Sequence, residues 1–247
     1  MALRALLGAV VLVFAFPSSA FAAEPPQALP SVWEFDEGQF QPATDSDGDG
    51  CYPTPAIGPD GRVAEGLNNS GALNGNCRDI WDLDSTNSYS RKKCNNGWCA
   101  FMYAYYFEKD QVVAGLDAFG HRHDWEHILI WVKDGIPRYV STSAHGGYST
   151  HPRSEVAWEE SHAKVVYHKD GGGTHAFRRA AFDETPENHY GKWQYPALVG
   201  WDYYPDGVRD ILTQADFGEA NFGLKDSAFS SELMKAKPGG IPFDPFS

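Results

Sequence analysis

The sequence predicts a mainly β protein with peripheral helices, an α+β domain built as a β-sandwich. Short segments rich in aromatic or β-branched residues and bounded by turn residues are typical of strands. Helical periodicity is weaker and follows turn residues or a serine cap at only two places, 206–214 and 230–237. No internal repeat or low-complexity tract is found, and the length suits a single core, so we expect one domain over 23–247. The expected strands are 101–107, 128–132, 138–143, 164–168 and 174–181.

Residues 1–22 have the pattern of a secretory signal peptide. Arg4 gives a short positive region, an apolar run covers residues 6–16, and the Ala-Phe-Ala of residues 20–22 fits a cleavage site. The apolar run is shorter than the about 20 residues that span a bilayer. We therefore predict cleavage after Ala22 and a secreted, extracellular protein, with a retained anchor as the alternative.

The acidic charge of the chain limits its partners. The whole chain has a net charge of −13, and removing residues 1–22 removes one base, Arg4, and no acid, which leaves −14. This balance argues against nucleic acid as a partner and against simple adsorption to anionic lipid. Any membrane activity would therefore need a specific head-group contact, a bridging cation, or both.

Residues 42–100 are dense in Gly, Asn, Asp and Ser, so we expect mostly loop, held by disulfides. Four cysteines in an exported protein indicate disulfides and allow three pairings. The spacing favours Cys51–Cys77 and Cys94–Cys99. A structural zinc site made of the four thiolates is the alternative.

An acidic turn within this region resembles the opening of a calcium loop. Asp45, Asp47 and Asp49 occupy positions 1, 3 and 5, and Gly50 follows at position 6. An EF-hand needs a glutamate at position 12, where this chain has Ala56, so an EF-hand is excluded. A calcium loop of another kind and a plain acidic turn both remain open.

The most informative stretch, residues 120–127, reads Gly-His-Arg-His-Asp-Trp-Glu-His just before a predicted strand. In an extended chain Asp124 and Glu126 point to one face. His121 can join them from the preceding turn, and Asp110 can approach from the neighbouring strand of the hairpin. The opposite face carries His123, Trp125 and His127, of which we expect Trp125 and His127 to face the core.

Such a set of side chains predicts a cation site. Carboxylates with a single imidazole suit a hard divalent ion, Mg²⁺, Ca²⁺ or Mn²⁺, better than Zn²⁺, which prefers more histidine or thiolate ligands. The alternative is a solvated strand edge with salt bridges to Arg122.

The heptapeptide at 120–126 resembles the signature of the necrosis- and ethylene-inducing peptide-like proteins. Segments 45–55, 100–110, 198–202 and 216–221 are similar to the same family, so the likeness covers nearly all of the mature chain. The extra cysteine pair and the acidic turn are similar to the type 2 branch. The signature positions are Gly120, His121, Arg122, His123, Asp124, Trp125 and Glu126.

The resemblance implies a central antiparallel β-sandwich similar to actinoporins and lectins, surrounded by helices. It implies a virulence factor that binds a divalent cation in a surface cavity and recognises glycosyl inositol phosphoryl ceramide sphingolipids on the outer face of the plant plasma membrane. Permeabilisation of that membrane and necrosis would follow. Carried over to this sequence, the metal ligands are Asp110, His121, Asp124 and Glu126.

One departure concerns the segment between Asp110 and His121, which is about three residues longer than the commonest type 1 spacing. Asp117, inside the extension, competes with Asp110 as a ligand. We keep Asp110 because Glu-Lys-Asp follows the aromatic strand where the family pattern places it. The loop 168–175 is glycine-rich and either approaches a sugar head group or is a plain hairpin loop.

Three functions fit these observations: a cytolysin, a secreted sugar- or lipid-binding relative that does not lyse cells, and a metal-dependent hydrolase with Glu126 as general base. No nucleophile elbow, HExxH pattern or paired-carboxylate pattern of a known enzyme class is present. We therefore expect that the protein is not an enzyme.

Overall fold

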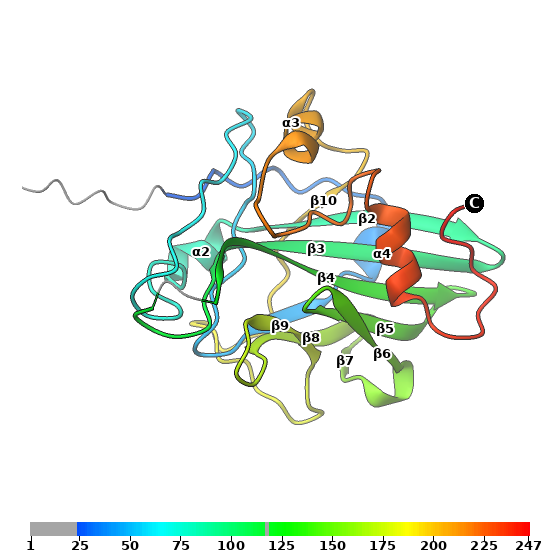
Figure 1. The fold of residues 1–247 in the computed structure, drawn as a ribbon. Coiled ribbons are helices and arrows are strands. Elements are labelled where there is room, and N and C mark those ends of the chain that lie inside the picture. Colours follow the sequence, from blue (N-terminus) through cyan, green and yellow to red (C-terminus); the bar gives the residue numbers. More distant parts are fainter. Residues whose placement is uncertain (1–23, 117–118) are drawn as a thin grey trace, which may run out of the picture.

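A β-sandwich of two sheets is seen in a computed structural model that describes residues 24–116 and 119–247 (Figure 1). The predicted signal peptide and Asp117 lie outside the described residues. The larger sheet has the order β10-β2-β3-β4-β5-β6, and in the smaller sheet β8 pairs with β1, β7 and β9. The strands of the larger sheet are β10 (Ala197–Gly200), β2 (Asn87–Asn95), β3 (Trp98–Asp110), β4 (His121–Lys133), β5 (Ile136–Ala144) and β6 (Gly147–Pro152). Those of the smaller sheet are β1 (Ala43–Ser46), β7 (Trp158–Glu159), β8 (His162–Lys169) and β9 (His175–Arg179).

Most strand pairs are antiparallel, as expected. The exceptions are β10 with β2 and β1 with β8, which are parallel. Short helices surround the sandwich, and α4 lies across the outer face of the larger sheet (Figure 1). The helices are α1 (Phe35–Gln39), α2 (Ile80–Asp84), α3 (Val208–Gln214), α4 (Phe229–Ala236) and the 3₁₀ turn Arg153–Glu155.

The aromatic strand β3 is buried on both faces, which explains its almost continuous apolar sequence. Its odd-numbered residues, such as Phe101 and Tyr105, pack between the two sheets against β8 and β9. Its even-numbered residues, such as Met102 and Tyr106, pack against α3, α4 and the C-terminal segments. Alternation along one central strand therefore builds both cores.

The predicted strands correspond to β3, β4, β5, β8 and β9, and the two predicted helices correspond to α3 and α4. Both predicted disulfides, Cys51–Cys77 and Cys94–Cys99, are confirmed, so the four-thiolate zinc site is wrong.

Most of residues 42–100 lie outside helices and strands, as expected, but β2 is an exception. Its sequence, Asn-Ser-Tyr-Ser-Arg-Lys-Lys-Cys-Asn, has few apolar residues and gives no strand signal. It forms a strand because β10 and β3 pair with its two edges. No helix in the described part of the chain is long and apolar enough to cross a membrane.

Candidate metal centre

Three of the predicted ligands come together where the β3–β4 hairpin ends. Asp110 closes β3, His121 opens β4, and the two are paired in register. One ligand atom each from Asp110, His121 and Asp124 lies within 4.8 Å of the others. The hairpin therefore brings the three side chains into a group that can hold one cation.

Strict alternation along β4 would place His121 on the opposite face from Asp124, because three positions separate them. His123 interrupts the alternation, since its backbone adopts a left-handed conformation with φ 63°. Such a conformation is uncommon for a residue other than glycine. The Nδ1 atom of His123 lies 2.6 Å from the hydroxyl of Tyr106, which holds the ring away from the metal group. We attribute the convergence of His121 on Asp124 to this irregularity.

The donor set fits a hard divalent ion. Nδ1 of His121 is 2.7 Å from the carbonyl oxygen of His123, so Nδ1 carries the proton and Nε2 is free to bind a metal. Two carboxylates supply oxygen ligands that Mg²⁺, Ca²⁺ and Mn²⁺ prefer.

Asp110 is oriented by a residue from the opposite sheet. The backbone N–H of His175, the first residue of β9, donates to both carboxylate oxygens of Asp110 at 2.9 and 2.8 Å. The Nδ1 atom of His175 is 2.8 Å from the same carboxylate. Its buried Nε2 atom has no hydrogen-bond partner among the described residues and lies 3.7 Å from Asp49. His175 is thus a positioning residue for Asp110 and connects the metal group with the acidic turn.

Asp124 is held in a similar way by Tyr167 of β8, whose hydroxyl donates to the carboxylate at 2.9 Å. The Tyr167 ring also stacks on His175, with ring centroids 5.1 Å apart. Both positioning residues lie more than forty positions from their partners in sequence. In the sequence His175 falls in the glycine-rich loop 168–175 and the expected strand 174–181, and Tyr167 falls in the expected strand 164–168, but no local signal marks either as a positioning residue.

Burial and mutual repulsion disfavour the anionic forms of Asp124 and Glu126 when no cation is bound. Burial, reinforced by the charge of Asp110, raises the pKa of Asp124 to about 7. Burial and the charge of Asp124 also raise the pKa of Glu126 well above its ordinary value. A cation would offset both effects, because it stabilises the ionised forms.

Glu126 does not join the group of three. Its carboxylate accepts a short hydrogen bond from the hydroxyl of Ser143, and that hydroxyl oxygen accepts a bond from the backbone of His127 at 2.6 Å. The structure therefore places Glu126 beside the metal group, without bringing it into the set of converging ligand atoms.

A cavity of about 330 Å³ opens on this group. The pairing of β5 with β4 begins only at Ile128, and the part of β4 before that point contributes His121 and residues 124–127 to the cavity wall. The other walls are the turn at residues 145–148, residues 219–221 and the polar face of α4. The cavity can hold a cation and a small polar ligand together.

Trp125 and His127 are buried, as expected. Trp125 packs on Phe217 and Phe222, with ring centroids 5.5 and 4.6 Å apart. His127 accepts a hydrogen bond from the backbone N–H of Gly223 at 3.1 Å, and burial lowers its pKa to about 4. A neutral, hydrogen-bonded imidazole of this kind contributes to the core.

The alternative of a solvated strand edge is wrong. Asp124 and Glu126 are buried, and Arg122 forms its hydrogen bonds with Asn68 and the backbone of Glu65 instead of with these carboxylates.

Side chains of the protein donate hydrogen bonds to the carboxylates of the acidic turn. Asp45 accepts a hydrogen bond from Asn188 at 2.7 Å, and Asp47 accepts from Arg178 at 3.3 Å. Across residues 24–116 and 119–247, Asp45, Asp47 and Asp49 do not form a group of converging ligand atoms. The calcium loop therefore stays a prediction.

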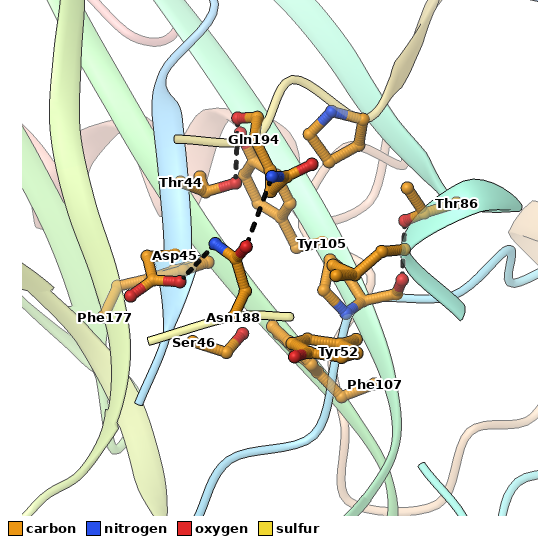
Figure 2. Close-up of a pocket in the computed structure, with 13 residues that line it drawn as sticks. Thr44, Asp45, Ser46, Tyr52, Thr86, Tyr105, Phe107, Phe177, Asn188 and Gln194 are labelled. Atoms are coloured by element: carbon orange, nitrogen blue, oxygen red, sulfur yellow. Dashed lines mark hydrogen bonds between the residues drawn. The ribbon is translucent and has the colours of Figure 1, made fainter. Parts of the chain in front are cut away.

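A small cavity is lined by residues 44–46 of β1, Tyr105 and Phe107 of β3 and Phe177 of β9 (Figure 2). Asp45, Asn188 and Gln194 form a hydrogen-bonded chain along one side of it. Its volume of about 10 Å³ is enough for roughly one water molecule. The hydroxyl of Tyr105, which has no hydrogen-bond partner within residues 24–116 and 119–247, is a suitable partner for that water. This cavity is a packing feature.

Comparison with known proteins places the chain in a family. The model of the necrosis inducing protein family (NPP1) matches residues 35–236. NLP effector protein 10 from Phytophthora capsici is 37% identical over 194 residues, which are 76% of this chain and 76% of that protein. Necrosis-inducing protein NPP1 from Phytophthora nicotianae is 35% identical over 193 residues, again 76% of each chain.

Solved structures agree with this relationship. NLPPya in complex with mannosamine superposes with a TM-score of 0.72 at 30% identity, covering 85% of this chain and 95% of that one. The non-toxic HaNLP3 protein superposes with a TM-score of 0.71 at 27% identity, covering 90% of this chain and 99% of that one. The match of the family model, the identity of the relatives and the shared fold show that the chain belongs to the necrosis-inducing protein family.

Proposed function

We propose that the protein is a secreted cytolysin that uses a divalent cation to hold the sugar head group of a plant sphingolipid. The observation that carries this proposal is the convergence of Asp110, His121 and Asp124 within 4.8 Å in a cavity of about 330 Å³. A cation bound there would accept oxygen atoms of a sugar or phosphate as further ligands. Mg²⁺ and Ca²⁺ suit the donor set best, with Mn²⁺ as a third choice.

Two observations support a sugar as the ligand. Solved structures of the related NLPPya contain mannosamine and glucosamine. The cavity walls also offer polar groups suited to hydroxyl or amino substituents, including Tyr148, Asn221 and Glu232. We propose glycosyl inositol phosphoryl ceramides of the plant plasma membrane as the source of the head group.

A bound cation would also offset the electrostatic repulsion between the acidic protein and an anionic membrane. Without the predicted signal peptide the protein has a net charge of −14, so an anionic membrane repels it within about a Debye length, roughly 8–10 Å. A cation held by two carboxylates on the protein and by the head group on the membrane would bridge like charges at the point of contact.

We propose binding without catalysis. Glu126, the residue considered as a general base, lies outside the group of converging ligand atoms, and one of its carboxylate oxygens accepts a hydrogen bond from the Ser143 hydroxyl.

A second candidate is a head-group-binding protein that does not lyse membranes. The non-toxic HaNLP3 protein has the same fold, with a TM-score of 0.71, so the fold is compatible with a lack of toxicity. A leakage assay separates the two candidates.

The test uses phosphatidylcholine vesicles with and without glycosyl inositol phosphoryl ceramide. We expect the mature protein with Mg²⁺ or Ca²⁺ to bind and permeabilise only the vesicles with sphingolipid. Asp124→Asn, which removes one ligand charge but keeps the shape, should abolish binding, and a chelator should do the same to the wild type. Asp183→Asn, at an exposed acid in the turn after β9, is the matched control. Binding without leakage would favour the second candidate, and normal binding by Asp124→Asn would contradict the cation bridge.

A further inference from the structure

A polar cavity of about 250 Å³ lies at the end of β10, on one edge of the larger sheet. Its walls come from the start of α1, from β2 and from residues 201–203, which follow β10. One wall residue, Arg91, pairs with Met102 of β3. Asp110 lies eight positions beyond Met102 on the same strand, or about 26 Å at roughly 3.3 Å per residue. The cavity is therefore distinct from the one at the metal group.

One carboxylate in the wall of this cavity is buried and fixed in position. Glu37 is 3% exposed, its Oε1 atom accepts a hydrogen bond from the Ser90 hydroxyl at 3.0 Å, and its Oε2 atom accepts one from the backbone N–H of Glu34 at 3.1 Å. Each carboxylate oxygen can accept a second hydrogen bond. A Cβ atom at Gly200 would lie 2.7 Å from Oε2 of Glu37 and 2.9 Å from the Tyr203 ring, so the missing side chain lets both approach. The cavity thus contains a preformed hydrogen-bond acceptor.

The charged groups in the wall are nearly balanced within the protein. The ammonium group of Lys92 donates to both carboxylate oxygens of Asp36 at 2.9 and 3.0 Å. Arg91 forms an ion pair with Asp226 at 2.7 Å. Two bases and three acids line the cavity, so its net charge is −1 when all of them are ionised. Such a balance gives no strong attraction for a charged ligand, and it suits hydroxyl groups, which both donate and accept hydrogen bonds.

Two aromatic side chains also line the cavity, Trp201 and Tyr203. The guanidinium carbons of Arg91 and Arg209 lie 4.3 and 5.2 Å from the ring centroid of Trp201, so this ring is held in place. Tyr203 is 40% exposed, and its ring has surface available to a ligand. The apolar C–H face of a pyranose packs on an aromatic ring while its hydroxyl groups bond to the polar side chains around it. The cavity therefore has the composition of a sugar-binding site.

A second polar cavity, of about 330 Å³, shares Trp201 with the first. Arg209, Asp210 and Thr213 of α3 form one side of it, and residues 225–227 form another. Two bases and two acids line this cavity, so its charges cancel. Two adjoining cavities of similar chemistry suit a ligand made of repeated sugar units better than a single sugar.

We propose that the two cavities beside Trp201 form a binding site for a neutral oligosaccharide, and that this site works without a metal ion. The Tyr203 ring stacks on one sugar unit, and the Glu37 carboxylate accepts a hydrogen bond from a hydroxyl group of that unit. The inference goes beyond the proposed function, because it concerns another ligand at another place on the sandwich. Two glycan sites on one chain would strengthen its attachment to a surface that displays both ligands.

The experiment titrates cellotetraose, xylotetraose and mannotetraose into the mature protein in the presence of a chelator, with binding followed by NMR. We expect at least one of these neutral tetrasaccharides to bind, and Tyr203→Ala to weaken that binding about tenfold. Tyr203→Phe keeps the ring and should bind normally, as should Asp124→Asn at the metal group. The matched control is Tyr195→Ala, because Tyr195 is also 40% exposed but donates to Glu159 of β7, in the smaller sheet, at 2.9 Å.

The inference is wrong if none of the three tetrasaccharides binds, if Tyr203→Ala binds normally, or if Tyr195→Ala loses as much affinity as Tyr203→Ala. Loss of binding in Asp124→Asn would place the ligand at the metal group and would also overturn it. Tighter binding of the acidic tetragalacturonate than of every neutral tetrasaccharide would contradict the assignment to neutral sugars. The chelator is present throughout, so none of these results depends on the cation bridge.

Discussion

Replacing His175 by alanine should weaken cation binding while leaving all three candidate ligands in place. The change removes the ring nitrogen that lies 2.8 Å from Asp110 but keeps the backbone N–H that donates to both oxygens of the same carboxylate. Asp110 would therefore stay near the site with less restriction on its rotation. Loss of an outer hydrogen-bond partner of a metal ligand typically lowers metal affinity 10- to 100-fold, or about 1.4–2.7 kcal/mol.

The assay is calorimetric titration of Mg²⁺ or Ca²⁺ into the metal-free protein, with thermal unfolding followed in parallel. His175→Asn should recover part of the affinity, since its side-chain amide can donate to Asp110. His168→Ala is the control, because His168 is half-buried on the adjacent strand β8 and does not line the cavity. An unchanged affinity in His175→Ala, with or without a fall in melting temperature, would refute the positioning role.

Two further predictions concern stability. Burial raises the pKa of Asp82 from 3.8 to about 7, so folding favours its protonated form. The contribution of this carboxyl to the free energy of unfolding is therefore fully present below about pH 4, and it falls by as much as about 4 kcal/mol as the pH rises to about 7. Asp82→Asn should reduce this loss in urea unfolding measured across that pH range, and an unchanged pH dependence would contradict the assignment. Breaking the disulfide of 26-residue separation, Cys51–Cys77, by a double Cys→Ala change should cost about 3.5 kcal/mol, whereas breaking Cys94–Cys99, of separation 5, should cost about 2 kcal/mol. Denaturant unfolding of the two variants measures both costs, and the reverse order would contradict the loop-entropy argument.

The sequence predicts the parts of the fold that depend on local pattern. The aromatic run of β3 and the buried run of β4 are apparent because each is apolar enough to form a core strand on its own. By contrast, β2 is polar, and β10 has only four residues, so neither has a local signal. Their strand conformation comes from pairing with residues distant in sequence.

The same distinction applies to the site. Asp124 is predictable from the spacing of the signature, and Asp110 from the hairpin that pairs it with His121. Spacing does not reveal that Ser143 holds Glu126 or that His175 holds Asp110. These contacts arise only when β5 and the second sheet pack against the hairpin, an arrangement that depends on the whole sandwich.

The central claim is that Asp110, His121 and Asp124 hold one divalent cation, and anomalous diffraction tests it most directly. Crystals of the mature protein grown with Mn²⁺ would show the bound metal through its anomalous signal. We predict one strong peak among the three side chains and loss of that peak in Asp124→Asn crystals under the same conditions. A peak at Asp45, Asp47 and Asp49 alone, or none at either place, would contradict the account.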